Sequence, residues 1–522
     1  MNKNNKIDVF KKNNKMGVFK KNDKIDVFKK NHKFDTFKIL YISIFLIIIA
    51  LPLIEMSTNL FDPPKLNEKR KKAEMPSFKG NPLNSEFISD IEDYFNDNYG
   101  FRDQFIMLNN TLDVKLLGVN TNKDSVIIGK NDYLYSAEEL DDYTKTNLLE
   151  DWEIKKLAKE LAKLQKDLKD RGIYFLFTVA PNKSTIYPEY MPFEENTSKE
   201  GNLDRLQREL DNLGVNSIDF KKLLLENKGE KDLYYKRDTH WNDIGSFLAT
   251  EALLQNLSKE YPIVDMPKIE GMKEEVYSGD LDGLLGLKSW INEYKLDIDY
   301  GYTYKKLPKM ISYMDSFSYN VLPKLDKYSS YRIDHHNIQA DMHSNLSYNI
   351  ENTKIIYFEI VERYLYKLLD YDFALFDDDL KELDGYTYNK TSLPLSEEDE
   401  KDIFTNYKYI EKVKNPDGSY YLESRYDDSF IIWYLPETNV NYLYLELSEP
   451  PKDISLLQFF WATEDEESDF TEEDSLKFIA TPLKTKYLID VRHLSIEDIN
   501  RFRLDIGDKP GTAIKVNKIE LY

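Results

Sequence analysis

Residues 173–180 read Ile-Tyr-Phe-Leu-Phe-Thr-Val-Ala, a nearly continuous apolar run that predicts a β-strand buried on both faces of a parallel sheet. A helix is predicted just before this strand, since one helical stripe is formed by Ile154, Leu157, Leu161, Leu164 and Leu168. Gly172 stands where a helix commonly ends in the left-handed conformation. Pro181, Asn182 and Lys183 follow the strand, at the sheet edge where open α/β sheets bind ligands.

The same alternation of strand and helix continues downstream. Further strands are predicted at residues 215–220, 233–236, 310–314 and 354–360, with helical patterns between them. Residues 258–305 show no clear period and are interpreted as an irregular insertion. Strands that alternate with helices predict an α/β fold, a parallel sheet with helices on both faces.

The pattern of the sequence changes near residue 395. Short aromatic-rich runs such as Phe430-Ile-Ile-Trp-Tyr are separated by turn signals such as Asn415-Pro-Asp-Gly. This pattern predicts an all-β sandwich over residues 400–522.

The N-terminal 56 residues differ from the rest. Residues 1–38 repeat Lys-Ile-Asp-Val-Phe-Lys-Lys-Asn with a nine-residue period and carry a net charge of +8. Residues 39–54 are uncharged and mostly apolar, which predicts a transmembrane signal anchor over 39–56; a cleaved signal peptide is the alternative. The lysines place the tail in the cytoplasm and the body outside by the positive-inside rule. A tail lying on anionic lipid is the second interpretation of the repeats.

Composition excludes several classes of function. The chain has no cysteine, which rules out disulfides, thiolate catalysis and cysteine-bound metals. The overall charge is −22, so the body beyond the tail is strongly acidic and lacks the basic surface that nucleic-acid binding needs. We therefore expect no nucleic-acid partner.

Three polar residues at predicted strand ends suggest acyl-transfer chemistry. Asp238 and His240 stand two positions apart, and Ser316 follows another strand. A serine hydroxyl becomes a nucleophile when a histidine takes its proton and a carboxylate orients the imidazole. Each residue also has an ordinary alternative, a surface histidine for His240 and a helix N-cap for Ser316.

Six segments of the chain carry a family resemblance. They are, in chain order, Asn98-Tyr-Gly-Phe-Arg-Asp, Val126-Ile-Ile-Gly, Ala180-Pro-Asn-Lys, Asp238-Thr-His-Trp-Asn, Asp315-Ser-Phe-Ser and Glu359-Ile-Val-Glu-Arg. Over residues 67–370 the chain resembles the SGNH-hydrolase-like O-acetyltransferases of exopolysaccharide synthesis, of the AlgJ and AlgX alginate-acetylation type, and the related DHHW proteins of Gram-positive bacteria.

This resemblance implies an SGNH-hydrolase-like fold over residues 85–390, behind a linker at 57–84, and a carbohydrate-binding-module-like sandwich over 400–522. It implies Ser316 as nucleophile, His240 as base and Asp238 as its partner. Substrate contacts are expected from Asn182, Lys183, Trp241 and Asp315. Neither a metal nor a bound cofactor is expected.

The resemblance also implies a biological setting. The acetyl donor is expected to be relayed from acetyl-CoA by a membrane-bound O-acyltransferase partner, and the acceptor to be a polysaccharide, within a possible glycan synthase complex. The body is expected to work outside a cell membrane that it spans once. Met314 departs from the family, which usually has glycine before the Asp-Ser pair, and we expect it to narrow the pocket, shift specificity or weaken activity.

Two other functions remain open at this point. An esterase with the same triad would pass the acyl group to water, and a non-catalytic glycan-binding scaffold would need no triad at all. Two metal sites are weaker candidates, one at His335, His336 and His343 and one for calcium in the acidic run 464–473. An ion pair is predicted among Glu359, Glu362 and Arg363. Rings that could stack on sugars are those of Tyr420, Tyr421, Trp433, Tyr434 and Trp461.

Overall fold

The computed structural model describes most of the chain. Its described residues are 36–58, 60–61, 71–76, 85–194, 198–263, 265–287, 291–301, 306–329, 332–335, 350–371, 373–378, 380, 383, 389–395, 403–414, 416, 420–424, 429–463, 470–506 and 513–522. The chain forms two compact units, Met1–Asn109 and Asn110–Tyr522.

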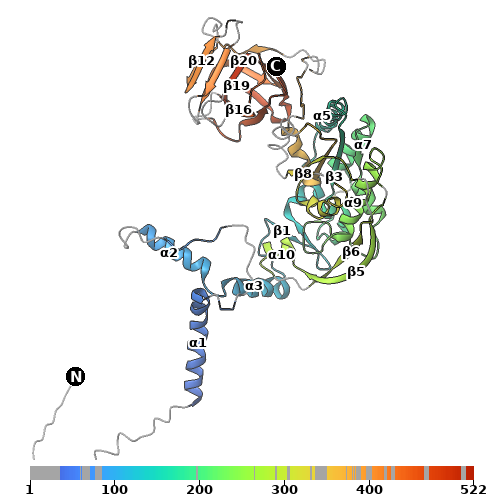
Figure 1. Cartoon of the computed structure of the whole chain (residues 1–522). Helices are drawn as coiled ribbons and strands as arrows, with labels where there is room; N and C mark the ends of the chain where they lie inside the picture. The colour runs from blue at the N-terminus through green and yellow to red at the C-terminus, as the bar shows by residue number, and fades with distance from the viewer. Residues whose placement is uncertain are drawn as a thin grey trace, which may run out of the picture. The chain divides into compact units, whose positions relative to one another are not determined.

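The first unit is helical. Helix α1 (Thr36–Thr58) is followed by α2 (Ser85–Asn98), and α3 (Arg102–Leu112) begins soon after it (Figure 1). Within the described residues, α1 alone is long and apolar enough to cross a membrane, with a mean hydropathy of 2.6 over Phe37–Thr58. An apolar helix is thus confirmed where the sequence predicts one, while its orientation stays a prediction. The nine-residue repeats lie outside the described residues.

A five-stranded parallel sheet organises the second unit. Its strand order is β4-β3-β9-β7-β8. The strands are β3 (Tyr174–Ala180), β4 (Ser217–Ile218), β7 (Met310–Tyr313), β8 (Arg332–His335) and β9 (Ile355–Val361). β9 lies between β3 and β7 and pairs with both in parallel, although it is the last of the five in the sequence. The buried strand predicted at residues 173–180 is β3.

Two hydrophobic cores sandwich this sheet, as the alternation along β3 illustrates. Phe175, Phe177 and Val179 face one core, whereas Leu176 and Ala180 face the other. The first core is covered by α5 (Asp151–Lys169), α7 (Asn202–Leu213) and the 3₁₀ helix η6 (Glu362–Asp370). The second is covered by α8 (Phe220–Glu226), α9 (Asp243–Leu257) and α11 (Leu322–Leu325). The predicted α/β sheet with helices on both faces is confirmed.

Two predictions around this sheet are wrong. Residues 233–236 are not a strand of the sheet, because Tyr234 makes only an isolated antiparallel bridge to Trp241. The segment interpreted as an irregular insertion contains an antiparallel hairpin of β5 (Lys268–Tyr277) and β6 (Ile291–Asp299), with α10 (Asp280–Leu284) between the strands. Most side chains of β5 are exposed, so the hairpin carries no apolar alternation that a sequence pattern could reveal.

Several short elements complete the α/β part. They are β1 (Val126–Ile128), β2 (Leu134–Ser136), η2 (Asp113–Leu117), η3 (Ala137–Glu139), α4 (Leu140–Thr144), α6 (Lys183–Ile186), η4 (Pro188–Tyr190) and η5 (Ser316–Asn320). β1 and β2 pair as an antiparallel hairpin.

The C-terminal part is the predicted sandwich of two antiparallel sheets. One has the order β12-β13-β20-β15-β18, with β10 also on β20, and the other β11-β14-β19-β16-β17. Their strands are β10 (Thr391–Ser392), β11 (Phe404–Lys408), β12 (Ile410–Lys414), β13 (Tyr420–Ser424), β14 (Phe430–Val440), β15 (Tyr442–Leu447), β16 (Ser455–Ala462), β17 (Ser475–Ala480), β18 (Lys486–Asp490), β19 (Ile496–Ile506) and β20 (Ala513–Leu521).

The aromatic residues predicted to stack on sugars do not share one environment. Trp433 and Trp461 are buried in the core between the sheets, with Trp433 fully covered, so neither ring offers a face to a ligand. Tyr434 is 42% exposed. The side chains of Tyr420 and Tyr421 lie outside the described set. Sugar binding by this domain stays a prediction.

Candidate active site

A short loop ahead of α9 supplies two of the three candidate catalytic residues. The backbone of Tyr235 donates to the carbonyl of His240, which closes the loop into a narrow turn around Asp238. The Asn242 side chain then caps α9 by accepting from the N–H groups of Ile244 and Gly245. The loop is therefore fixed at both ends.

The third residue, Ser316, opens the 3₁₀ helix η5 directly after β7. Asp315 is the N-cap of η5, and its carboxylate accepts from the backbone N–H of Phe317 at 2.9 Å. The other oxygen of Asp315 accepts from the backbone of Val361 at the end of β9. The turn that carries the serine is thus tied to the central strand of the sheet.

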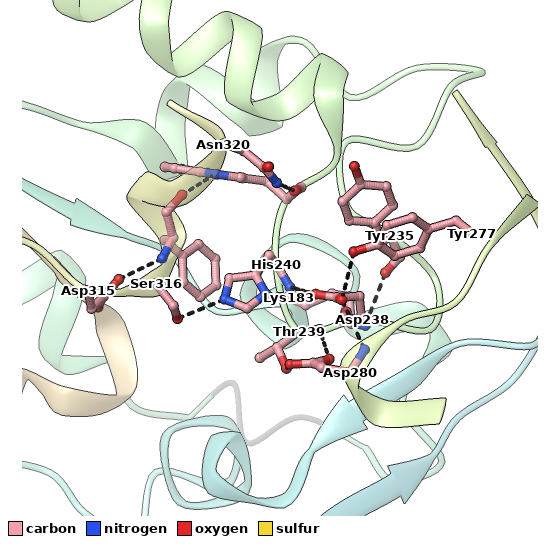
Figure 2. Close-up of polar contacts among 12 residues, drawn as sticks. Lys183, Tyr235, Asp238, Thr239, His240, Tyr277, Asp280, Asp315, Ser316 and Asn320 are labelled. Carbon is pink, nitrogen blue, oxygen red and sulfur yellow. Dashed lines mark hydrogen bonds and ion pairs between the residues drawn. The ribbon is translucent and has the colours of Figure 1, made fainter. Parts of the chain in front are cut away.

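These elements bring the three side chains into one hydrogen-bonded row (Figure 2). The Nδ1 atom of His240 lies 2.7 Å from an oxygen of Asp238, and its Nε2 atom lies 2.8 Å from the Ser316 hydroxyl. The His240 side chain is 20% exposed, so the row is open to a small reactant. A hydroxyl that donates to Nε2, with Nδ1–H held by a carboxylate, is the arrangement that activates a serine.

The carboxylate of Asp238 accepts four hydrogen bonds. One oxygen accepts from the ring and the backbone N–H of His240, and the other from the Tyr277 hydroxyl at 2.9 Å and the Asp280 backbone at 3.0 Å. Burial pushes the pKa of Asp238 upward, but the hydrogen bonds and charge of His240 outweigh it and lower the pKa to about 2. Asp238 is therefore ionised at neutral pH.

The Lys183 side chain binds the backbone of the same loop. Its ammonium group donates to the carbonyls of Tyr235 and Lys236, both at 3.2 Å, and to that of Asp238 at 2.6 Å. The side chain is fully buried, and burial lowers its pKa to about 8 against the opposing effect of nearby acids, Glu139 first among them. Three donors meet three acceptors, which leaves no ammonium hydrogen for a ligand.

The other predicted substrate-binding residues are also engaged by the protein. Asn182 is fully buried and donates from its side chain to Asp142. Trp241, also fully buried, donates to the carbonyl of Phe317. Substrate contact by Asn182, Lys183, Trp241 and Asp315 stays a prediction, and the role visible here is to hold the site together.

A buried acid pair lies behind the nucleophile turn. Burial raises the pKa of Asp315, and it raises the pKa of Glu359 well above its usual value, with the charge of Asp315 adding to the effect. The Ser318 hydroxyl donates to Glu359 at 2.6 Å. Burial therefore favours the protonated form of Glu359, while Asp315 accepts from two backbone groups.

The structure places Met314 in the core and gives Arg363 a partner distant in the sequence. Met314 is fully buried, so its side chain lines no exposed surface, and its effect on specificity and activity stays a prediction. Arg363 pairs with Glu138 at 3.1 Å, and Glu362 accepts from the backbone of Asn182, so the ion pair predicted within residues 359–363 is wrong. Partners distant in the sequence replace the local ones.

One group of described residues has the spacing of metal ligands. Ligand atoms of Asp238, His240 and Asp280 lie within 4.8 Å of one another. Both carboxylates already accept protein hydrogen bonds, since the two Asp280 oxygens bind the N–H and hydroxyl of Thr239, so we assign no cation here. The predicted histidine site falls on residues that are undescribed or described only as backbone, and most of the acidic run 464–473 lies outside the described ranges.

Sequence reasoning missed the contribution of the hairpin. Tyr277 and Asp280 both reach Asp238, yet no motif marks them, because their partners lie 39 and 42 positions away. Spatial closeness of this kind leaves no spacing signal in a single sequence.

Comparison with known proteins finds similarity to one family of acetyltransferases. Residues 126–323 match the family model described as "SGNH hydrolase-like domain, acetyltransferase AlgX". The chain is 24% identical over 212 residues to the "Probable alginate O-acetylase AlgJ" of Pseudomonas syringae pv. tomato, a match that covers 39% of this chain and 52% of the relative. The chain spans about half the length of the curated relatives it matches.

Solved structures are also similar. The O-acetyltransferase domain of Pseudomonas putida AlgJ is 20% identical with a TM-score of 0.36, covering 50% of this chain and 96% of that one. Pseudomonas aeruginosa AlgX is 14% identical with a TM-score of 0.39, covering 76% of this chain and 94% of that one.

Proposed function

Because residues 126–323 match the family model described as "SGNH hydrolase-like domain, acetyltransferase AlgX", we propose that this protein is a polysaccharide O-acetyltransferase. The observation that carries the proposal is the hydrogen-bonded row of Ser316, His240 and Asp238 within this domain. The relatives named alginate O-acetylase support a polysaccharide as the acceptor.

The first half-reaction forms an acetyl-serine. The Ser316 hydroxyl gives its proton to Nε2 of His240 while its oxygen attacks the carbonyl carbon of the acetyl donor. The ionised Asp238 stabilises the imidazolium that results. We propose the backbone N–H of Ser316 as a donor to the developing oxyanion. The imidazolium then protonates the leaving group as the bond from the carbonyl carbon to the donor breaks.

The second half-reaction passes the acetyl group to a sugar. A hydroxyl of the acceptor gives its proton to Nε2 of His240 and attacks the ester carbon. The Ser316 oxygen leaves and regains a proton from the imidazolium, which restores the free enzyme. Water in place of the sugar would give an esterase, so the acceptor decides the outcome.

The N-terminal helix supports an extracytoplasmic setting. An apolar span of 22 residues precedes the α/β part, and the lysine-rich tail precedes the span. We propose that the span anchors the body outside the cell membrane. There it would receive acetyl groups exported from cytoplasmic acetyl-CoA by a membrane-bound O-acyltransferase, close to the machinery that makes the glycan.

The full chain in detergent, with p-nitrophenyl acetate as donor, tests the proposal. Oligosaccharides of mannuronic acid, glucose and N-acetylglucosamine serve as acceptors, and mass spectrometry follows both acetylated sugar and free acetate. We expect acetylated sugar from the wild type and none from Ser316→Ala. Free acetate alone, whichever acceptor is present, would favour the esterase, and no difference between wild type and Ser316→Ala would favour a scaffold.

Ser312→Ala is the matched control. Ser312 lies on β7 four residues before the nucleophile, is fully buried, and its hydroxyl has no hydrogen-bond partner within the described part of the chain. We expect this variant to keep wild-type transfer.

A further inference from the structure

The hairpin β5–β6 contacts the catalytic loop at its base. The Tyr277 ring, at the last position of β5, stacks on Tyr235 with centroids 4.1 Å apart and planes 7° apart. Two residues later, Gly279 lies so close to Arg237 that a Cβ atom would be 1.9 Å from its carbonyl oxygen. The hairpin thus packs directly against the backbone that presents Asp238.

Polar contacts extend this packing along the loop. The carboxylate of Asp280 accepts from the N–H and the hydroxyl of Thr239, and Arg237 forms an ion pair with Asp282. On β6, the carboxylate of Glu293 accepts from the backbone of Lys236. Successive loop residues from 236 to 239 therefore each have a partner in the hairpin segment.

Strand β5 itself is mostly exposed. No side chain of β5 is fully buried, and Val276, beside Tyr277, is 68% exposed. The rest of the hairpin segment has further contacts, since the backbone of Leu296 on β6 donates to the carboxylate of Asp243 and α10 packs in a small core with β1 and β2. At the end of β5, the tyrosine stack and the bonds to residues 236–239 are the contacts that align the hairpin with the loop.

We propose that the β5–β6 hairpin is part of the catalytic apparatus and that Tyr277 is a positioning residue, which fixes the Asp238 carboxylate so that it orients His240. This inference rests on the proposed function, because it assigns a role within the same acyl-transfer site. Tyr277 acts through Asp238 and does not itself touch the reacting atoms.

The geometry explains why the hydroxyl matters. A carboxylate with one oxygen bonded to His240 is free to rotate about its Cβ–Cγ bond unless the other oxygen is also held. The Tyr277 hydroxyl and the Asp280 backbone hold that second oxygen, as Figure 2 shows. Phenylalanine at position 277 would keep the stacked ring and remove only one of the two restraints. With one hydrogen bond in place of two on this oxygen, the carboxylate is restrained less firmly and orients the imidazole less well.

Tyr277→Phe in the full chain tests this role, with Tyr294→Phe as the matched control. Tyr294 lies on β6 of the same hairpin, beside Lys231 rather than Asp238. The first half-reaction is followed with p-nitrophenyl acetate, so no polysaccharide is needed. We expect kcat of Tyr277→Phe to fall about tenfold, the effect of losing one hydrogen bond to a charged group, with KM unchanged.

A spectroscopic readout separates positioning from simple stability. The proton shared by His240 Nδ1 and Asp238 gives a low-field NMR resonance, which we expect to move in Tyr277→Phe and to stay unchanged in Tyr294→Phe. The inference is overturned if Tyr277→Phe matches Tyr294→Phe in kcat and resonance. It is equally overturned if kcat falls only together with the melting temperature while the resonance stays in place.

The two proposals fail in distinguishable ways. If wild type and Ser316→Ala react with the donor at the same rate, the proposed function fails. If only the comparison of Tyr277→Phe with Tyr294→Phe shows no difference, the proposed function stands and the role of Tyr277 does not.

Discussion

The Nε2 atom of His240 lies 2.8 Å from the hydroxyl oxygen of Ser316, although 76 positions separate the two residues in the chain. The sheet brings them together, because Ser316 follows β7 and the carboxylate of Asp315 beside it is bonded to the end of β9. The His240 ring also packs 4.9 Å from that of Phe317, which limits its movement away from the serine. The reactive pair is thus held by packing on one side and by Asp238 on the other.

Asp238→Asn should lower kcat/KM for p-nitrophenyl acetate by about 10³–10⁴, since an amide in this place favours the wrong histidine tautomer. The double variant Asp238→Asn/Ser316→Ala should be no slower than Ser316→Ala, because the residues act as one unit. Asp124→Asn, at an exposed position, is the control and should keep wild-type kinetics. Multiplicative losses in the double variant would contradict a shared role.

Lys183→Met should destabilise the protein by about 3 kcal/mol, because it leaves three buried carbonyls without their donor. It should also reduce kcat, since those carbonyls belong to the loop of Asp238. Urea unfolding followed by tryptophan fluorescence measures the first effect. Lys222→Met, on the exposed side of α8, should change the free energy of unfolding by less than about 0.5 kcal/mol. Equal stability of the two variants would argue against the role of Lys183.

Glu362→Gln should alter the dependence of stability on pH. Burial, with the charge of Asp142 adding to it, raises the pKa of Glu362 to about 7 from 4.5, so the folded state binds a proton that the unfolded state releases in this interval. The wild type therefore loses stability as pH rises from 4.5 to 7. Glutamine has no proton to lose and can still accept from Asn182 and Thr185.

The stability of Glu362→Gln relative to wild type should accordingly rise by about 3 kcal/mol between pH 4.5 and pH 8. Urea titrations at both pH values measure it, and Glu226→Gln, at an exposed position of α8, serves as the control. A constant difference across the interval would show that Glu362 titrates normally.

Gly279→Ala should disturb the loop from the hairpin side. The added Cβ would overlap the Arg237 carbonyl, and either the hairpin or the loop must move, at a cost of about 1–3 kcal/mol. We expect kcat of Gly279→Ala to fall together with its stability. At Gly229 a Cβ would meet nothing within 4 Å, so Gly229→Ala should leave both quantities unchanged. Thermal melting and steady-state kinetics on the pair provide the comparison.

Topology can be read with single cysteines, because the natural chain has none. In intact cells, Ser448→Cys on the exposed surface of the sandwich should react with a membrane-impermeant maleimide. Asn13→Cys in the tail should react only after lysis. Labelling of both cysteines in intact cells would contradict the proposed orientation.

The sequence predicted the features that repeat or alternate. The continuous apolar run at residues 173–180 predicts β3, and the helical stripe of apolar residues before it predicts α5. The triad residues were found because serine, histidine and aspartate stood near predicted element ends, although the strand expected before Asp238 is only one bridge. Family resemblance rather than periodicity supplied their roles.

A single sequence cannot predict the β5–β6 hairpin or the proximity of Asp315 and Glu359, for physical reasons. β5 exposes both of its faces, so no apolar period distinguishes it from a loop. The proximity of Asp315 and Glu359 depends on the pairing of β7 with β9, which a single sequence does not specify. The sequence predicts substrate contact by Lys183, which stays a prediction, but no sequence pattern reveals the backbone carbonyls to which its ammonium group donates.

The position of β9 has a consequence for the timing of assembly during synthesis. Because β9 pairs with both β3 and β7, the two halves of the sheet have no shared strand until residues 355–361 have emerged. A nascent chain that ends before residue 355 contains Ser316, His240 and Asp238 but lacks β9, the strand that joins β3 to β7. We therefore expect the proposed active site to assemble late in translation, when most of the polypeptide is already outside the ribosome.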